Sequence, residues 1–429
     1  MKKNYQTKTT AAMIVPDSVA IAMADLAQEL REGLLALAVG TGLQVMGVLL
    51  EESVIALAGP KGRHDPDRVA VRHGHEEGSV TLGGRRVPVR RPRVRSADGA
   101  CELSVPAYEH FSSTEVLSRL ALEKMLAKLS TRRYKSGLEP VGERVEAHAS
   151  STSRSAVSRR FVEATEHALG ELLAGDLSEL DLVALMVDGV HFGDHVCVVA
   201  MGIDIAGRKH PLSITEGDTE NATVVKDLLV GLRDRGLEVT RPVLVVIDGA
   251  KALTSAVKAV FDHPVIHRCQ LHKIRNVESK LPKTLAETVT KKMRAIYHYD
   301  DALRAEAELE ELGRQLQRSH PGAAGSLREG LSETLTVMAL KVPPTLSRTL
   351  RSTNAIESMI EICRDHSANV KRWRDGQMAL RWCAAGMVEA GKQFRKVNGF
   401  LHLPALRAAL DDYVERGVTP IDYNKEDAA

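Results

Sequence analysis

The sequence LVALMVDG at residues 182–189 and the sequence VLVVIDG at residues 243–249 decide the expected fold. Each is a short apolar run, typical of a buried strand, that ends in an Asp–Gly pair. If the two strands lie side by side and parallel, Asp188 and Asp248 emerge at the same edge of one sheet. Nearby carboxylates repel each other and favour a divalent cation, which takes oxygen ligands. A single Asp–Gly pair is more often only a turn, so it is the repetition that indicates a metal site.

Strand and helix patterns alternate around these two runs. Residues 196–203 and 210–215 are apolar runs separated by a turn, which indicates an antiparallel pair of strands. An amphipathic helix is expected over 221–235, before the second Asp–Gly run, and another over 250–260, after it. A short strand over 264–267 follows. This order predicts an α/β core.

The strand signals stop after residue 268. Residues 269–342 have helical spacing throughout, with Leu309, Leu312 and Leu316 marking one apolar face in a charged background. Pro343–Pro344 interrupts the pattern, because proline cannot continue a helix interior. The sequence therefore predicts an all-helical segment after the last strand of the α/β core.

A third carboxylate is expected on the helix that begins near Ser352. Ser352 or Thr353 can cap this helix, and Glu357 lies in its first turns. With Asp188 and Asp248, Glu357 would complete the ligand set of a two-metal phosphoryl-transfer site. Glu361, one turn later, is the alternative ligand, and a solvated surface helix is the alternative reading of the whole segment.

The N-terminal third reads as helices interrupted by a hairpin. Residues 17–58 have helical spacing, and residues 66–108 have alternating runs around Gly83–Gly84, a hairpin signal. Helices are expected over 114–129, over 138–147 and from Arg154 onward. The last two helices, joined by a Ser-rich turn, have the form of a helix-turn-helix DNA reader; an ordinary helical hairpin is the alternative.

Charge is segregated along the chain. The 58 Lys and Arg residues nearly balance the 56 Asp and Glu residues, for a formal net charge of +2. Residues 61–95 alone carry ten basic against four acidic residues, whereas residues 161–194 carry eight acidic residues and no Lys or Arg. Further basic blocks span 119–160, 268–294 and 364–396. Such blocks can follow phosphates, although each one alone is more often a solvated face. Aromatic residues make up only 3 %, which argues against a surface that stacks single-stranded bases.

The remaining composition favours a cytoplasmic protein. Apolar stretches such as 196–203 fall short of the roughly 20 residues of a membrane span. The N-terminus lacks the apolar run of a signal peptide, and five cysteines do not make a disulfide framework. We therefore expect no membrane partner.

Three longer stretches resemble the Mutator-like transposases of bacterial insertion sequences, which are DDE enzymes. They are EGDTENATVVKDLLVGLRDRGLEVTRPVLVVIDGAKALTSAV, HRCQLHKIRNV and RSTNAIES. The similarity covers about residues 100–410. It implies a ribonuclease H-like α/β catalytic core interrupted by an all-α insertion, after a mostly helical N-terminal DNA-binding region with a small β-hairpin. It also implies that Asp188, Asp248 and Glu357 form an Asp-Asp-Glu triad holding two Mg²⁺ (or Mn²⁺) ions.

Cys269 and His272 match the Cys-x-x-His signature that opens the insertion in this family. The chain departs from the family pattern at His267, where the family usually has Gln before Arg-Cys. A Cys-x-x-His pair without a second pair is a weak zinc motif. We therefore expect a role in packing or in shaping the active site, and no zinc.

The resemblance implies double-stranded DNA as partner, both as element ends and as target, and a homodimer that holds two ends. The expected DNA-binding residues are Arg154, Arg159, Arg160, Lys273, Arg275, Lys371, Arg372 and Arg374. The alternatives are a metal-dependent nuclease or resolvase on the same fold and a DNA-binding regulator with an inert triad.

The expected domain boundaries follow from these patterns. They are residues 1–110 (helical with a β-hairpin), 111–178 (helix-turn-helix-like), 179–268 (first part of the core), 269–347 (insertion), 348–400 (core completion with the Glu357 helix) and 401–429 (tail).

Overall fold

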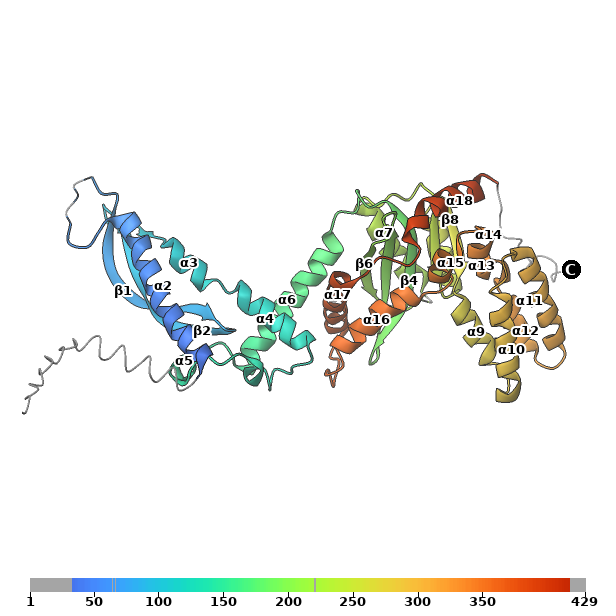
Figure 1. Ribbon diagram of the computed structural model, residues 1–429, viewed down its shortest axis with the longest axis horizontal. Coiled ribbons are helices and arrows are strands. Elements are labelled where there is room, and N and C mark those ends of the chain that lie inside the picture. The colour runs from blue at the N-terminus through green and yellow to red at the C-terminus, as the bar shows by residue number, and fades with distance from the viewer. Residues whose placement is uncertain (1–32, 64, 66, 220, 417–429) are drawn as a thin grey trace, which may run out of the picture. The chain divides into compact units, whose positions relative to one another are not determined.

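The computed structural model describes residues 33–416 except 64, 66 and 220. The chain divides into two compact units, residues 1–161 and 162–429 (Figure 1). The division falls inside one helix, α6 (Arg154–Ala174), between the predicted boundaries at 110 and 178. Each unit is described by itself.

The first unit is built on a three-stranded antiparallel sheet of β1 (Ala70–Leu82), β2 (Arg85–Ser96) and β3 (Glu102–Leu103). The predicted hairpin is confirmed: Leu82 pairs with Arg85 across Gly83–Gly84. Both glycines have positive φ, 53° and 78°, as a two-residue turn matching the strand twist requires.

Helix α2 (Leu34–Ala58) packs one side on this hairpin, where Met46 and Leu50 meet Val80 and Val87. Contrary to the expectation from shorter apolar runs, α2 is long and apolar enough to span a membrane, by length and composition alone. A buried core helix of a soluble protein passes the same test, and so does a signal sequence near the N-terminus. Residues 17–32 of the predicted helix lie outside the described residues.

Short helices complete the first unit. They are α3 (Pro106–Ser112), α4 (Glu115–Leu126), the 3₁₀ turn η1 (Lys135–Gly137), α5 (Glu143–His148) and the start of α6. The helix predicted over 138–147 is only six residues long. The predicted serine cap before Arg154 is confirmed, because the Ser153 hydroxyl accepts a hydrogen bond from the Ala156 amide at 3.3 Å.

The second unit contains a five-stranded mixed sheet with the order β6-β5-β4-β7-β8. The strands are β4 (Leu182–Phe192), β5 (His195–Asp204), β6 (Lys209–Glu216), β7 (Val243–Ile247) and β8 (Pro264–Arg268). The pairs β4–β5 and β5–β6 are antiparallel, whereas β4–β7 and β7–β8 are parallel. The predicted α/β core and its antiparallel pair are therefore present.

Both faces of this sheet are covered by helices, and side chains alternate between them along each strand. Leu185 and Val245 face α7 (Ala222–Asp234) and α8 (Lys251–Val260). Met186 and Val246 face the opposite core, which contains α16 (Asn354–His366), α17 (Gly376–Gln393) and α18 (Leu403–Glu415) (Figure 1). The 3₁₀ turn η2 (Phe400–His402) leads into α18.

Strand β4 differs from the prediction in length. We expected it to end at Val187, but it continues to Phe192 because its antiparallel pairing with β5 extends that far. Its parallel pairing with β7 ends at Met186. Asp188 therefore lies within a strand, just beyond the point where the parallel neighbour ends.

The predicted all-helical segment is confirmed. Its helices are α9 (Gln270–Glu278), α10 (Lys283–Ile296), α11 (Ala302–Gln317), α12 (Pro321–Arg328), α13 (Leu331–Thr334) and α14 (Thr336–Ala339). They enclose a core of their own that includes Leu309, Leu312 and Leu316. Helix α15 (Pro344–Leu350) leads back to the sheet.

Helix α18 corrects the prediction of a C-terminal tail from residue 401. Its residues Leu403, Leu406 and Leu410 are fully buried in the core beneath the sheet. The spacing i, i+3, i+7 in this segment is that of one buried helical face. The described part of the predicted tail is therefore integral to the core.

Candidate active site

Asp188 and Asp248 are brought to the same level of the sheet by strand register. The parallel pairs of β4 and β7 end with Met186 opposite Val246. Extending this register by two residues would set Asp188 opposite Asp248, which directly follows β7, and the charges of Asp248 and Glu357 both act on Asp188. Neighbouring strands are about 4.8 Å apart, so the two residues start from adjacent backbone positions. Each aspartate lies two residues beyond Met186 or Val246, and side chains two residues apart on a strand share a face. Both aspartates therefore belong to the face that α16 covers.

Local backbone groups fix each carboxylate. The Asp188 Oδ1 atom accepts a hydrogen bond from the Gly189 amide at 2.8 Å, and the Asp248 Oδ1 atom accepts one from the Ala250 amide at 2.9 Å. Gly249 has φ 103°, a conformation that favours glycine. Within the described chain neither aspartate has an ion-pair partner, so their remaining lone pairs are open to a ligand.

Glu357 reaches the same face from the first turn of α16. Its Oε1 atom accepts a hydrogen bond from the Thr353 hydroxyl at 2.8 Å and lies 3.7 Å from Nε2 of His272. The alternative ligand, Glu361, is exposed and forms no ion pair or side-chain hydrogen bond among the residues that the structure describes. The surroundings therefore favour Glu357 as the third carboxylate.

Thr353 connects Glu357 to the start of the insertion. It occupies the N-cap position of α16 but makes no side-chain cap, contrary to the expectation, because its hydroxyl is turned to Glu357. The Thr353 hydroxyl lies 3.4 Å from both Cys269 Sγ and His272 Nδ1, and the Thr353 amide also lies 3.4 Å from Cys269 Sγ. Cys269 and His272 thus meet Glu357 through one fully buried threonine.

The electrostatics of the site show that its charged groups interact. Burial raises the pKa of Asp188 to about 6, and the charges of Asp248 and Glu357 act in the same direction. His272 and the Gly189 amide oppose this increase. The hydrogen bond with Cys269 is the main cause that raises the pKa of His272 to about 9, and Asp188 and Glu357 contribute.

Cys269 is a buried thiol with a lowered pKa. Burial acts to raise the pKa, but hydrogen bonds with His272 and Thr353 outweigh it. Cys269, His272 and Glu357 present one ligand atom each within 4.8 Å of one another. His267 is fully buried, and burial lowers its pKa to about 4, so it is a neutral core residue.

The donor set fits a hard divalent cation. Asp188, Asp248 and Glu357 offer carboxylate oxygens on one face of the sheet, which is the chemistry Mg²⁺ and Mn²⁺ prefer. The Cys269 thiol already forms hydrogen bonds with Thr353 and His272. It is connected to Glu357 through these two residues, at the start of the insertion.

Most of the predicted DNA-binding residues lie at the surface. Arg154 and Arg159 on α6 and Arg275 on α9 are exposed, as are Lys371, Arg372 and Arg374 between α16 and α17. Trp373, between the last two arginines, packs on Phe192 at the end of β4 with ring centroids 5.0 Å apart. Arg160 is half-buried and donates to the Ser151 carbonyl at 2.7 Å.

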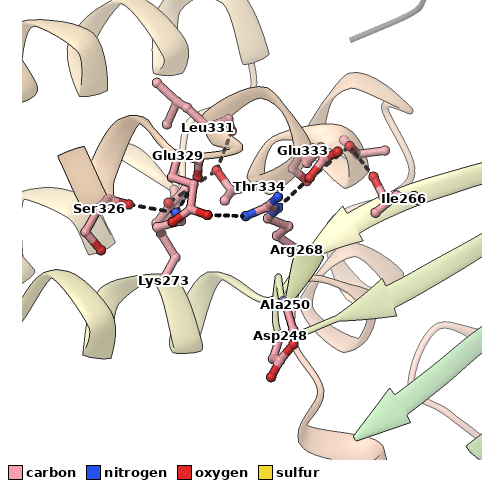
Figure 2. A network of polar contacts seen from close by, with 12 residues as sticks. Asp248, Ala250, Ile266, Arg268, Lys273, Ser326, Glu329, Leu331, Glu333 and Thr334 are labelled. Carbon is pink, nitrogen blue, oxygen red and sulfur yellow. Dashed lines mark hydrogen bonds and ion pairs between the residues drawn. The ribbon is translucent and has the colours of Figure 1, made fainter. Parts of the chain in front are cut away.

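Lys273 does not fit the predicted contact with DNA. It is 5 % exposed, and its ammonium group donates to the carbonyl oxygens of Ser326, at 2.7 Å, and Glu329 (Figure 2). Burial lowers its pKa to about 8. Lys273 lies on the same helical face as the buried Ile274 and Val277, which is why it points inward whereas Arg275 does not.

Arg268 is a structural residue that the sequence analysis did not single out. Its guanidinium pairs with Glu333, and its side chain crosses the turn after Asp248, where a Cβ at Gly249 would lie 3.0 Å from it (Figure 2). Arg268 therefore joins the insertion to the loop that carries Asp248. Only the apolar run before Arg268 marked the end of β8 in the sequence, and nothing there indicated that the arginine is buried.

Comparison with known proteins identifies the family that the chain resembles. The family model described as "Transposase, Mutator family" matches residues 17–397. The chain is 29 % identical over 367 residues to the transposase for insertion sequence element ISRM5 of Rhizobium meliloti, covering 84 % of this chain and 89 % of the relative. It is 31 % identical over 239 residues to the transposase for IS6120 of Mycolicibacterium smegmatis, covering 54 % and 72 %. It is 25 % identical over 334 residues to the transposase for IS256 in Tn4001 of Staphylococcus aureus, covering 75 % and 82 %.

Proposed function

Because the chain belongs to the Mutator family of transposases, we propose that it cuts and joins DNA at the terminal inverted repeats of an insertion sequence, using Asp188, Asp248 and Glu357 with Mg²⁺ or Mn²⁺. The observation that supports this proposal is the β4–β7 register, which ends with Met186 opposite Val246 and, extended by two residues, would bring Asp188 level with Asp248 on the face that the Glu357 helix covers. The strand order, an antiparallel meander followed by two parallel crossover strands, supports a ribonuclease H-like core.

The chain's own residues would hold two metal ions and align the DNA. When bound, the ions would activate water or a DNA 3′-hydroxyl and stabilise the leaving 3′-oxygen. The Gly189 and Ala250 amides orient the two aspartates, and Thr353 orients Glu357. The exposed Lys371, Arg372 and Arg374 would hold phosphates next to the end of β4.

The N-terminal unit would bind the element ends. Exposed Arg154 and Arg159 at the start of α6 and the α5–α6 turn support a helix-turn-helix role. Synapsis of two ends calls for a homodimer on DNA, and we place this reaction in the bacterial cytoplasm.

The test is cleavage of a labelled duplex carrying the inverted repeat that flanks the coding region, with and without Mg²⁺. Asp188→Asn, Asp248→Asn and Glu357→Gln should each lower cleavage by about a thousandfold or more while end binding persists. Glu361→Gln, on the exposed side of the same helix, is the matched control and should cleave normally. Loss of cleavage in Glu361→Gln with activity in Glu357→Gln would reverse the assignment of the third ligand.

The same assay separates the two alternatives. A nuclease or resolvase would cut the ends but would not join pre-cleaved ends to target DNA. An inert DNA-binding regulator would bind the ends equally well with and without the three carboxylates and would cut nothing.

A further inference from the structure

A cavity of about 300 Å³ lies beside the candidate active site, where the insertion meets the start of α16. Its walls come from α9, α10, the end of α15 and the first residue of α16. Arg294, His298, Arg348 and Arg351 line it together with the apolar Leu271 and the ring of Tyr297. None of these four basic residues belongs to the predicted DNA-binding set.

The charges around this cavity are unbalanced. Arg294, Arg348 and Arg351 form no ion pair with a carboxylate within the part of the chain that the structure describes. The Nε2 atom of His298 lies 3.5 Å from the Arg351 guanidinium. Burial and the charge of Arg348 together lower the pKa of Arg351. Three guanidinium groups facing one space without an acid favour an anionic ligand.

The backbone adds to this preference. The cavity reaches Asn354, the first residue of α16, a helix of 13 residues. The N-terminus of a helix carries a partial positive charge and unpaired amide groups, which bind phosphate. This end of α16 and the three arginines act on the same space.

The cavity adjoins the catalytic carboxylates through the chain itself. Ser352 and Asn354 line the cavity, and Thr353 between them donates to Glu357. Leu271 lines the cavity, and the next residue, His272, lies 3.7 Å from Glu357. The residues that line the cavity are therefore direct sequence neighbours of residues that contact Glu357.

We propose that this cavity, the Arg351 cavity, binds one nucleotide of the element-end strand next to the cleaved bond. Its phosphate contacts Arg348 and Arg351, and its sugar and base rest on Leu271 and Tyr297. A cationic side and an apolar wall fit a nucleotide better than a bare anion. This inference rests on the proposed function, because it takes a strand of element-end DNA as ligand.

The first experiment compares Arg348→Gln/Arg351→Gln with Arg318→Gln. Arg318 is an exposed arginine of the insertion that forms no ion pair with any described residue. Binding to the element-end duplex is measured by fluorescence anisotropy across a salt series. The double variant should bind about 10–100-fold more weakly, and its slope of log K against log salt should fall by about one, as for one lost phosphate contact. Affinity and slope equal to those of Arg318→Gln would overturn the inference.

The second experiment places a single neutral methylphosphonate at successive positions around the cleaved bond. The wild-type protein should lose affinity at one position, and the double variant should be insensitive there but respond normally elsewhere. Uniform sensitivity of both proteins would overturn the inference. So would stabilisation by inorganic phosphate alone with no selective DNA position, because the cavity would then be a site for free anions.

These outcomes are separable from failure of the proposed function. If the wild-type protein cleaves the ends with Mg²⁺ but shows no selective phosphate position, the proposal for the Arg351 cavity is rejected and the proposed transposase function stands. If the wild-type protein neither binds nor cleaves the ends, both proposals are rejected.

Discussion

In the three-stranded sheet of the first unit, arginines are paired with carboxylates on neighbouring strands, whereas the five-stranded sheet presents two aspartates without an ion-pair partner in the described chain. Arg91 pairs with Glu76, and Arg93 lies 2.5 Å from Glu102. Asp188 and Asp248 receive only backbone hydrogen bonds. The basic block at 61–95 is thus partly neutralised by the fold itself, whereas the two unpaired aspartates are those that we propose as metal ligands.

After the three proposed metal ligands themselves, the largest effect is expected at Glu357's neutral neighbour Thr353, which holds this carboxylate beside His272. Thr353→Val keeps the side-chain shape but removes the hydroxyl that donates to Glu357. Cleavage of the end duplex should fall about 10–100-fold, and more Mg²⁺ should be needed for half-maximal rate, as for other residues that orient a metal ligand. Thr353→Ser restores the hydroxyl and should restore both quantities. Equal metal requirement in Thr353→Val and wild type would show that Thr353 only packs.

The second prediction concerns what the unpaired aspartates do to stability. The folded-state pKa of Asp188 is about 6, above its ordinary value of 3.8, so the folded protein binds the proton more tightly than the unfolded chain. Stability should therefore fall as pH rises from about 4 to about 6. At pH 7.5 in EDTA, Asp188→Asn should be more stable than wild type by about 1–3 kcal/mol.

Urea denaturation at several pH values measures this difference. The two proteins should converge below pH 4, where the wild-type carboxyl is protonated in both states. Mg²⁺ should stabilise wild type more than Asp188→Asn. A constant difference across the whole pH range would contradict an origin in the Asp188 charge.

The third prediction tests a buried ion pair of the first unit. The Arg85 side chain is 4 % exposed, and its Nε atom lies 2.6 Å from Glu146 Oε2, an ion pair without the angle of an aligned hydrogen bond. Glu146→Gln leaves this guanidinium without its counter-charge and should destabilise the first unit by about 1–3 kcal/mol. Hydrogen exchange of the β2 amides should accelerate, and Glu139→Gln, at an exposed position, is the control. Unchanged exchange would show that the pair contributes little.

The smallest effect is expected at the solvent-exposed pair of the same sheet. Arg93→Gln breaks the contact with Glu102, but water and salt screen exposed ion pairs. The melting temperature should change by no more than the error of the measurement, at both low and high salt. A large decrease would show that the hairpin depends on its surface charges.

The sequence predicted the catalytic sheet well because its signals are physical and local. Uninterrupted apolar runs mark strands buried on both faces, and the Asp–Gly ends mark the edge where they leave the core. The length of β4 was underestimated, although Val190 and Phe192 continue the alternation that a longer strand requires. The spacing of Leu309, Leu312 and Leu316 likewise predicted a buried helical face that the structure contains.

Contacts between distant segments could not be predicted from patterns of one chain segment at a time. The role of Thr353 depends on Cys269 and His272, which lie on the other side of the insertion in sequence. Composition assigned Lys273 to a basic block, but its place on the buried face of α9 decides its role. Arg348 and Arg351 lie outside every basic block and become a charged group only where α15 meets α10.

The insertion begins and ends at one point of the core. The Gln270 amide donates to the Arg351 carbonyl at 3.1 Å, and the Thr353 amide lies 3.4 Å from Cys269 Sγ. These two contacts hold the two ends of the insertion together, whatever the conformation of the residues between them. The number of residues separating Asp248 from Glu357 is therefore no measure of how far apart the carboxylates lie. A helical module of another length could therefore join the same two points without moving Glu357 away from the sheet.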